Sequence, residues 1–273
     1  MLRRSIKARI SLTTLAIFVI GIWGLAIFVT KMLRDDIERL IGDQSLSAAT
    51  SLAAEIDGQL DDRLKALESV AKRITPVMLK DDDVIQRFLE ERPSLSVLFN
   101  GGSVVTTVDG VAVADVPLSA GRRGVNYADR DYVIGAIKDG KATIGKAVMG
   151  KKLRVPVIGM SVPIRDSDGS VIGVLFGAVN LSKSGFLDRL GENHYGKSGG
   201  FLLMDLTNNI FVTATDKSRA LQPIAAPGVN AIIDRRRQGF FGPLVGINTQ
   251  GKEVLSSASP IRSAGWIVTI TIG

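Results

Sequence analysis

The sequence predicts an α+β protein in which a transmembrane helix continues into a long helix and is followed by two antiparallel-sheet modules in tandem. Three observations support this prediction. An uncharged segment near the N-terminus is long enough to cross a membrane. Apolar residues then recur at spacings of three and four between residues 31 and 75. Two later segments share one strand–turn–strand pattern around the tripeptide Pro-Ile-Arg.

The predicted transmembrane helix covers residues 10–30, which lie between Arg9 and Lys31 and contain no ionisable group. At about 1.5 Å per residue, this segment spans about 31 Å, the thickness of a bilayer's hydrocarbon core. Basic residues crowd the preceding flank, so the positive-inside rule places residues 1–9 in the cytoplasm and the rest of the chain outside. A cleaved signal peptide is the alternative, but its apolar core would span only about 7–15 residues. We therefore expect an uncleaved signal anchor.

The distribution of charge indicates a membrane-anchored N-terminus more than a nucleic-acid partner. The chain has 34 basic and 27 acidic residues and a net charge of +7. Residues 1–34 hold six of the basic residues and no acidic one, so 28 basic against 27 acidic residues remain. The chain contains no cysteine, which excludes disulfides and thiolate sites. An exported chain without cysteine fits a bacterial periplasm, with the predicted anchor in the inner membrane, and no motif calls for a cofactor.

Residues 31–75 predict one long helix that continues the membrane helix outward. Thr75-Pro76 would end it, because the residue before proline is disfavoured in the α region. The helix could be a coiled-coil stalk or a spine against which globular modules pack. We favour the spine, because the apolar stripe is wider than a coiled-coil seam. We also expect the part near the membrane to pair with a second copy in a homodimer, around Leu33, Ile37 and Leu40.

Residues 76–183 predict the first, membrane-distal module. Asp81-Asp82-Asp83 is typical of a helix cap, and Asp109-Gly110 predicts a hairpin turn. Asp129 is expected to cap a short helix that ends near Gly140. The expected elements are a helix at 84–90 and strands at 103–108, 111–116, 146–150, 153–165 and 171–181.

Residues 184–273 predict the second, membrane-proximal module. Its expected elements are helices at 184–190 and 229–237 and strands at 201–205, 210–215, 240–247, 253–261 and 266–272. Pro163-Ile164-Arg165 and Pro260-Ile261-Arg262 each end a strand that turns into an apolar strand. This shared context predicts two copies of one module. Residues 191–198 match the phosphate-loop pattern GxxxxGK[ST], but the expected helix before them and strand after them reverse the order that the motif requires, so we expect a glycine-rich turn.

One segment, NYADRDY at residues 126–132, combines groups suited to binding a carboxylate. With Asp129 as helix cap, Arg130 and Tyr132 would lie in the first turn. A guanidinium can donate two parallel hydrogen bonds to a carboxylate, and the helix N-terminus adds partial positive charge. The alternative is that Arg130 pairs with Asp129 or Asp131 on the surface. Further cations on the next hairpin could add to the positive field: Lys146, Lys151, Lys152 and Arg154.

Two stretches resemble the double Cache family of extracytoplasmic sensor domains. They are NYADRDYVIGAIKDGKATIGKAVMGKKLRVPVIGMSVPIRDSDGSVIGVLFGAVNLS and the second half, from YGKSGGFLLMDLTNNIFVTAT to the last strand. The membrane helix and the long helix fit the same layout, so the resemblance covers essentially the whole chain. It implies two PAS-like modules, with the ligand in the membrane-distal one. It also implies a receptor of the chemoreceptor, histidine kinase or diguanylate cyclase type, with an output domain after Gly273.

The resemblance also implies ligand-binding residues. In the amino-acid-binding members, an arginine followed two residues later by an aromatic residue holds the ligand carboxylate, which corresponds to Arg130 and Tyr132. Tyr127 stands near the place of an upstream tyrosine of that motif. Val133 replaces a second aromatic residue. Asn180 stands where those members have an aspartate that pairs with the ligand amine, so the resemblance implies carboxylate recognition more than amino-acid recognition. The expected ligand is a small organic anion, either a simple carboxylate or an amino acid.

The expected function is therefore the reception of a small-molecule signal and its transmission across the membrane, with no enzymatic activity in this region. Two other classes were considered. A membrane-anchored periplasmic enzyme would need a catalytic constellation, and none has supporting context. A dimerisation or scaffold domain without a ligand is the third class. Ligand-induced thermal stabilisation would distinguish these classes.

Overall fold

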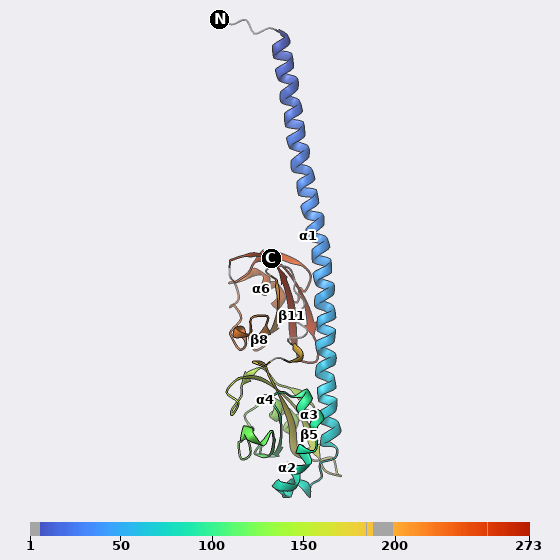
Figure 1. The fold of residues 1–273 in the computed structure, drawn as a ribbon, viewed down its shortest axis with the longest axis vertical. Helices are drawn as coiled ribbons and strands as arrows, with labels where there is room; N and C mark the ends of the chain where they lie inside the picture. Colours follow the sequence, from blue (N-terminus) through green and yellow to red (C-terminus); the bar gives the residue numbers. More distant parts are fainter. Residues whose placement is uncertain (1–5, 184, 188–198, 250) are drawn as a thin grey trace. The chain divides into compact units, whose positions relative to one another are not determined.

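The computed structural model describes residues 6–183, 185–187, 199–249 and 251–273. The chain forms two compact units, residues 1–44 and 45–273, and each is considered by itself. Helix α1 (Ile6–Ala71) begins in the first unit and ends in the second (Figure 1). The predicted helix at 184–190 lies partly, and the segment 191–198 entirely, outside the described residues.

The first unit consists of the N-terminal part of α1. By length and composition, α1 is the one helix among the described residues that could cross a membrane. Its apolar side chains are exposed in this unit, for example Phe18 at 68% and Trp23 at 67%. These properties agree with the predicted membrane segment.

In the second unit, α1 is the spine that the sequence predicts. Leu52, Ile56 and Leu60 of α1 are buried in one core together with residues from both sheets. The helix ends at Ala71, earlier than the predicted residue 75. The last turn tightens instead, because Ile74 N donates to Ala71 O at 3.1 Å and so satisfies a carbonyl at the helix end. Ile74 remains buried in the core.

The first module contains an antiparallel sheet with the strand order β2-β1-β6-β5-β3, and β4 also pairs with β5. Strand β6 is central, between the first strand of the module and β5. The strands are β1 (Ser103–Thr107), β2 (Ala112–Val116), β3 (Thr143–Ile144), β4 (Val148–Met149), β5 (Pro156–Arg165) and β6 (Val171–Asn180).

The second module repeats this arrangement with the order β8-β7-β11-β10-β9. Its last strand, β11, is again central. Pro163 of β5 pairs with Val174, and Pro260 of β10 pairs with Ile267, so the shared tripeptide has the same place in both sheets. The expectation of two copies of one module is confirmed. The strands are β7 (Gly200–Asp205), β8 (Ile210–Ala214), β9 (Leu244–Ile247), β10 (Glu253–Ile261) and β11 (Trp266–Ile272).

Short helices cover the sheets. Asp81 caps α2 as predicted, because its side chain accepts hydrogen bonds from Asp83 N and Val84 N at 3.0 and 3.2 Å. In the second module, Asn230 is the cap, which explains why the helix begins later than residue 229. The helices are α2 (Asp82–Glu90), α3 (Pro93–Leu98), α4 (Asp131–Ile134) with a π-helical continuation (Gly135–Asp139), and α6 (Ala231–Arg237).

Two predicted strand boundaries in the first module are wrong. Residues 153–155 are not extended, because Arg154 has a φ of 53° in the left-handed region, so β5 begins only at Pro156. The strand expected at 146–150 is reduced to Val148–Met149 and separated from β3. The backbone N–H of Lys146 donates to the Asp131 carboxylate at 2.9 Å rather than to a strand. In the second module, β9 starts at Leu244 instead of residue 240.

Candidate functional site

The candidate site lies on the face of the first sheet that points away from α1. Along β6, Leu175 and Val179 belong to the core that includes α1. Val174 and Phe176 point to the other side and form a separate apolar cluster with Tyr127 and Tyr132. Strand alternation therefore directs a set of aromatic side chains toward the segment that carries the predicted site.

The turn before α4 differs from the prediction in its capping residue. Arg130, not Asp129, is the N-cap residue, with an extended backbone and no side-chain cap. The Asp129 carboxylate accepts a hydrogen bond from Lys151 Nζ at 2.6 Å instead. Asp131 accepts from Tyr132 N at 2.9 Å. Tyr132 lies in the first turn as expected, and Arg130 lies just before it.

The two tyrosines stand against Phe176. The Tyr127 ring meets Phe176 edge-on at 5.0 Å between centroids, and the Tyr132 ring lies at 5.3 Å. Tyr132 also requires a glycine in the neighbouring strand: a Cβ at Gly159 of β5 would collide with the Tyr132 ring. The absence of a side chain at Gly159 therefore leaves the space that the Tyr132 ring occupies.

A pocket of about 20 Å³ lies between these rings and the β4–β5 hairpin. Arg130, Tyr132 and Tyr127 all line it, so the structure brings three of the four predicted residues together. Residues 148–153 of the hairpin cover it, and Lys151 and Lys152 are among its lining residues, whereas Lys146 and Arg154 are not. No carboxylate lines this pocket in the part of the chain that the structure describes.

Asn180 does not join the pocket. It lies on β6, on the same face as Phe176 and Ala178, and its Cα is paired with Val157. Its side-chain oxygen accepts a hydrogen bond from Ser182 N at 2.9 Å. Its backbone is fixed by Asn100, whose side chain accepts from Asn180 N at 2.7 Å. The fourth predicted residue therefore stands beyond the edge of the pocket.

The pocket carries positive charge. Arg130 Nη2 donates to Met149 O at 3.1 Å, and within the described residues Arg130 forms no ion pair with Asp129 or Asp131. The Arg122 charge is compensated by buried Asp115, which Arg122 Nε contacts at 2.6 Å. Because Lys151 is paired with Asp129, Arg130 and Lys152 carry the charge that no described carboxylate neutralises.

Both tyrosine hydroxyls can act as hydrogen-bond donors. Burial raises the pKa of Tyr132 well above its ordinary value and also raises the pKa of Tyr127. Both phenols are therefore neutral at physiological pH. Neither hydroxyl makes a hydrogen bond with a described residue. A guanidinium and two phenolic donors around one pocket suit a carboxylate or a similar oxyanion.

The sequence analysis missed Phe176 and Arg122. Phe176 is the one aromatic residue in an otherwise aliphatic strand, and its alternation with Leu175 could have placed it on the site face. Arg122 lies only four residues before the motif, but its position at the pocket depends on its contact with Asp115 of β2 at 2.6 Å, which no local signal predicts.

Comparison with known proteins identifies the fold. The family profile described as Cache domain matches residues 30–272. No curated protein sequence matches the chain.

Solved structures share the fold at low sequence identity. One is the ligand-binding domain of the Pseudomonas fluorescens chemoreceptor CtaA in complex with L-isoleucine, with 15% identity, a TM-score of 0.62, and coverage of 89% of this chain and 94% of that one. Another is the ligand-binding domain of the Pseudomonas aeruginosa PAO1 amino acid chemoreceptor PctC in complex with GABA, with 19% identity, a TM-score of 0.64, and coverage of 87% and 99%. The extracellular ligand binding receptor from Desulfohalobium retbaense has 15% identity and a TM-score of 0.63, and the match covers 84% of this chain but 40% of that one.

Proposed function

This chain belongs to the Cache domain family, and we propose that it is the extracytoplasmic sensor region of a membrane-bound signalling receptor. In this proposal, a small organic anion binds in the first module, and the resulting conformational change passes to the membrane. Residues 1–9 are cytoplasmic, residues 10–30 span the bacterial inner membrane, and the remainder is periplasmic. The receptor is a homodimer, and a cyclase, kinase or chemotaxis module is its output.

The observation that carries this proposal is the grouping of Arg130, Tyr127 and Tyr132 around one pocket. Among the described residues, the Arg130 guanidinium donates to the backbone carbonyl of Met149 at 3.1 Å, and a ligand carboxylate can replace this neutral partner with a stronger, charge-assisted one. The two tyrosine hydroxyls supply further donors. Isoleucine and GABA, the ligands named in the related structures, both carry a carboxylate as well as an ammonium group.

The ligand class follows from the charge of the pocket. An amino acid also needs an acceptor for its ammonium group, and no carboxylate lines the described pocket. An asparagine at position 180 can accept a hydrogen bond but cannot neutralise an ammonium. The pocket therefore favours a simple organic anion over a zwitterion.

Binding would move the β4–β5 hairpin. A volume of about 20 Å³ has room for little more than one water molecule, which needs about 10–15 Å³ by this measure, so a ligand must displace the β4–β5 hairpin. Two contacts hold the hairpin down: Arg130 to Met149 O and Lys151 to Asp129. A ligand anion competes for both cations. Its arrival would release the hairpin and couple occupancy to a change in shape.

The test is calorimetric titration of the full chain in nanodiscs with simple carboxylates, their neutral amides and amino acids. Arg130→Ala should weaken carboxylate binding about 30-fold or more, because a desolvated charge-assisted contact is lost. Arg130→Lys should rescue little, since a point charge does not replace the planar fork. Arg123→Ala is the matched control, because Arg123 pairs with Asp82 outside the pocket. Unchanged affinity in Arg130→Ala would place the ligand elsewhere.

Topology needs its own test. A reporter that works only outside the cytoplasm, fused after Gly273, should be active. Activity of a reporter that works only in the cytoplasm would contradict the receptor orientation.

A further inference from the structure

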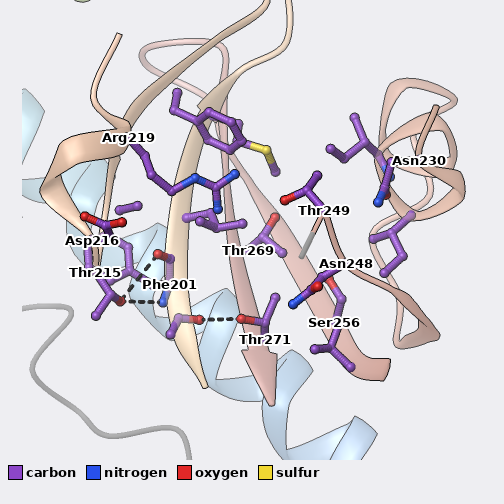
Figure 2. A pocket seen from close by; sticks show the side chains of 18 of the residues that line it. Phe201, Thr215, Asp216, Arg219, Asn230, Asn248, Thr249, Ser256, Thr269 and Thr271 are labelled. Atoms are coloured by element: carbon purple, nitrogen blue, oxygen red, sulfur yellow. Dashed lines mark hydrogen bonds between the residues drawn. The ribbon is translucent and has the colours of Figure 1, made fainter. Parts of the chain in front are cut away.

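The second module contains a cavity of about 240 Å³ on the sheet face that points away from α1 (Figure 2). Val268 and Ile270 of β11 pack into the core with α1. Thr269 and Thr271 point to the other side and line the cavity. This side corresponds to the face of the first module on which the candidate site lies.

The two cavities occupy equivalent positions in the repeat. Because Pro163 pairs with Val174 and Pro260 pairs with Ile267, counting along the central strands places Thr269 where the first module has Phe176. By the same count, Thr271 stands where the first module has Ala178. Phe176 fills its site, whereas the smaller Thr269 leaves space. The second module therefore retains the site position in an open form.

Thr269 presents an unused hydrogen-bonding group to this cavity. The residue is 2% exposed, and its hydroxyl has no hydrogen-bond partner within the described residues. Figure 2 shows Thr269 projecting into the cavity from the sheet. Buried hydroxyls almost always have partners, because leaving one unpaired costs free energy. A bound ligand with an oxygen would supply the missing partner.

A buried guanidinium beside the cavity also lacks a counter-charge. Arg236 of α6 is 1% exposed. Its donors go to neutral oxygens, at 2.9 and 2.8 Å to the carbonyls of Phe240 and Gly242 and at 2.7 Å to that of Ser256, and its Nε has no partner among the described residues. Burial lowers its pKa to about 10, so it remains charged at neutral pH. This uncompensated charge makes the cavity favourable for an anion.

A second guanidinium is available for direct contact. The Arg219 guanidinium stacks over the Phe211 ring at 4.1 Å, and within the described residues this side chain forms no hydrogen bond or ion pair. Figure 2 shows its side chain extending into the cavity. The one carboxylate among the described lining residues, Asp216, accepts a hydrogen bond from Ser218 N at 3.0 Å. The Arg219 guanidinium is therefore available to bind an oxyanion, and stacking on the Phe211 ring fixes the orientation of its plane.

Apolar side chains form a further part of the lining: Leu202, Met204, Ile232, Ile233 and Val254. From this combination we infer that the second module holds a second ligand site, for a small aliphatic monocarboxylate. Its carboxylate contacts Arg219, an oxygen of the ligand accepts from the Thr269 hydroxyl, and its hydrocarbon part packs on the apolar walls. A cavity of about 150 Å³ accepts benzene, so 240 Å³ suits an acid with a short or branched chain.

The experiment is a thermal-shift and calorimetric titration of the full chain in nanodiscs with propionate, isovalerate and hexanoate. Isovaleramide, which has the shape of isovalerate without its charge, is the matched ligand control. We expect isovalerate to raise the unfolding temperature with increasing concentration and isovaleramide to have no effect at equal concentration.

Variants then assign the site. Arg219→Gln should weaken isovalerate binding about tenfold or more, because a charge-assisted contact is lost. Arg235→Gln is the control, since Arg235 stacks over Phe240 and does not line the cavity. Thr269→Val should weaken binding several-fold while leaving the unfolding temperature of the unliganded protein unchanged or higher, because it removes an unpaired buried hydroxyl at constant shape. Thr269→Phe should fill the cavity as Phe176 fills the equivalent position of the first module, and it should therefore block binding.

Arg130→Ala separates this inference from the proposed function of the first module. If isovalerate still binds Arg130→Ala but not Arg219→Gln, the second site is confirmed whatever the first module does. Loss of binding in Arg130→Ala with wild-type affinity in Arg219→Gln and Thr269→Val would overturn the second site. Absence of any carboxylate-dependent stabilisation at millimolar concentrations would overturn it as well.

Discussion

Lys151 Nζ lies 2.6 Å from the Asp129 carboxylate and 2.7 Å from Asn126 O. This contact joins the β4–β5 hairpin to the loop that carries Tyr127 and Arg130, and it closes the pocket of the first module. Lys151 also lies over the Tyr127 ring at 5.6 Å. The Lys151 ammonium therefore holds the β4–β5 hairpin over the pocket and lies where a ligand anion would bind.

Asp129→Asn should strengthen binding of a small carboxylate by a few-fold. The substitution removes the anion that competes with the ligand for Lys151, and the Lys151 side chain is only 28% exposed. The cost in stability should be small, about 0.2–1 kcal/mol, as for other surface ion pairs. Calorimetry at low salt measures the affinity. Weaker binding than wild type would mean that Asp129 positions the site rather than competes with the ligand.

Gly159→Ala should destabilise the first module and disturb the site together. The new Cβ would collide with the Tyr132 ring from the neighbouring strand, and overpacking of this kind costs about 1–3 kcal/mol. Urea unfolding measures the loss, and tyrosine fluorescence or NMR reports the ring displacement. Gly169→Ala is not a suitable control, because Gly169 has a φ of 84°. Gly58→Ala is a suitable control, because nothing lies within 4 Å of the added Cβ at this position.

Asn180→Asp should shift ligand preference from simple anions toward molecules with an ammonium group. The new carboxylate repels an organic anion and can pair with an amine. Because Asn180 stands beyond the edge of the pocket and its side-chain oxygen accepts a hydrogen bond from Ser182 N at 2.9 Å, the effect requires the hairpin to open first. Competition titrations of a carboxylate against the matching amino acid measure the preference. An unchanged ratio would mean that position 180 does not set the ligand class.

Single cysteines at Leu33, Ile37 and Leu40 should cross-link two copies of the chain in membranes. These apolar side chains are 58%, 47% and 72% exposed, and an exposed apolar stripe on a helix favours a partner helix. The chain has no other cysteine, so each product is unambiguous. Asp35→Cys, on the opposite face of the helix, is the control. Equal cross-linking at all four positions would indicate random collision rather than a dimer interface.

Asp57→Asn should lower stability at neutral pH by about 1 kcal/mol, with a smaller effect in acid. Asp57 of α1 accepts hydrogen bonds from Ser263 N at 3.0 Å, Ser263 Oγ at 2.6 Å and Arg262 N at 3.1 Å. Burial raises the Asp57 pKa, but the hydrogen bonds from Ser263 outweigh it, and the net pKa lies below the ordinary value of 3.8. The carboxylate therefore stabilises the fold above that pH, and this contribution is lost as the pH falls through the depressed pKa.

Chemical denaturation of the wild type and of Asp57→Asn between pH 7 and pH 3 measures this difference. Asp61→Asn is the control, because Asp61 pairs with Lys65 on the exposed side of α1 at 2.6 Å. A difference that stays constant down to pH 3 would show that the loss in Asp57→Asn does not depend on the charge of Asp57.

The sequence by itself determined the kinds of elements and their order. The 3.6-residue period of α1, the Asp109-Gly110 turn, the Asp81 cap and the repeated Pro-Ile-Arg context are local patterns, and local backbone geometry follows from them. The same patterns predicted the spine, because an apolar stripe that is too wide for one partner helix needs a sheet to cover it. The NYADRDY segment likewise identified Arg130, Tyr127 and Tyr132 as neighbours.

Only the tertiary structure decided what surrounds those neighbours. Phe176 of β6 meets the tyrosines, and Gly159 of β5 makes room for Tyr132, because α4 and the loop before it pack on the sheet. The Asp129 carboxylate accepts a hydrogen bond from Lys151 Nζ instead of capping the helix. The register of β11 places Thr269 in an open cavity, at the position where β6 has Phe176. The Thr269 hydroxyl there has no hydrogen-bond partner within the described residues. A pocket depends on the volumes left between side chains from several strands, and those volumes depend on register and packing, which no local pattern in one segment contains.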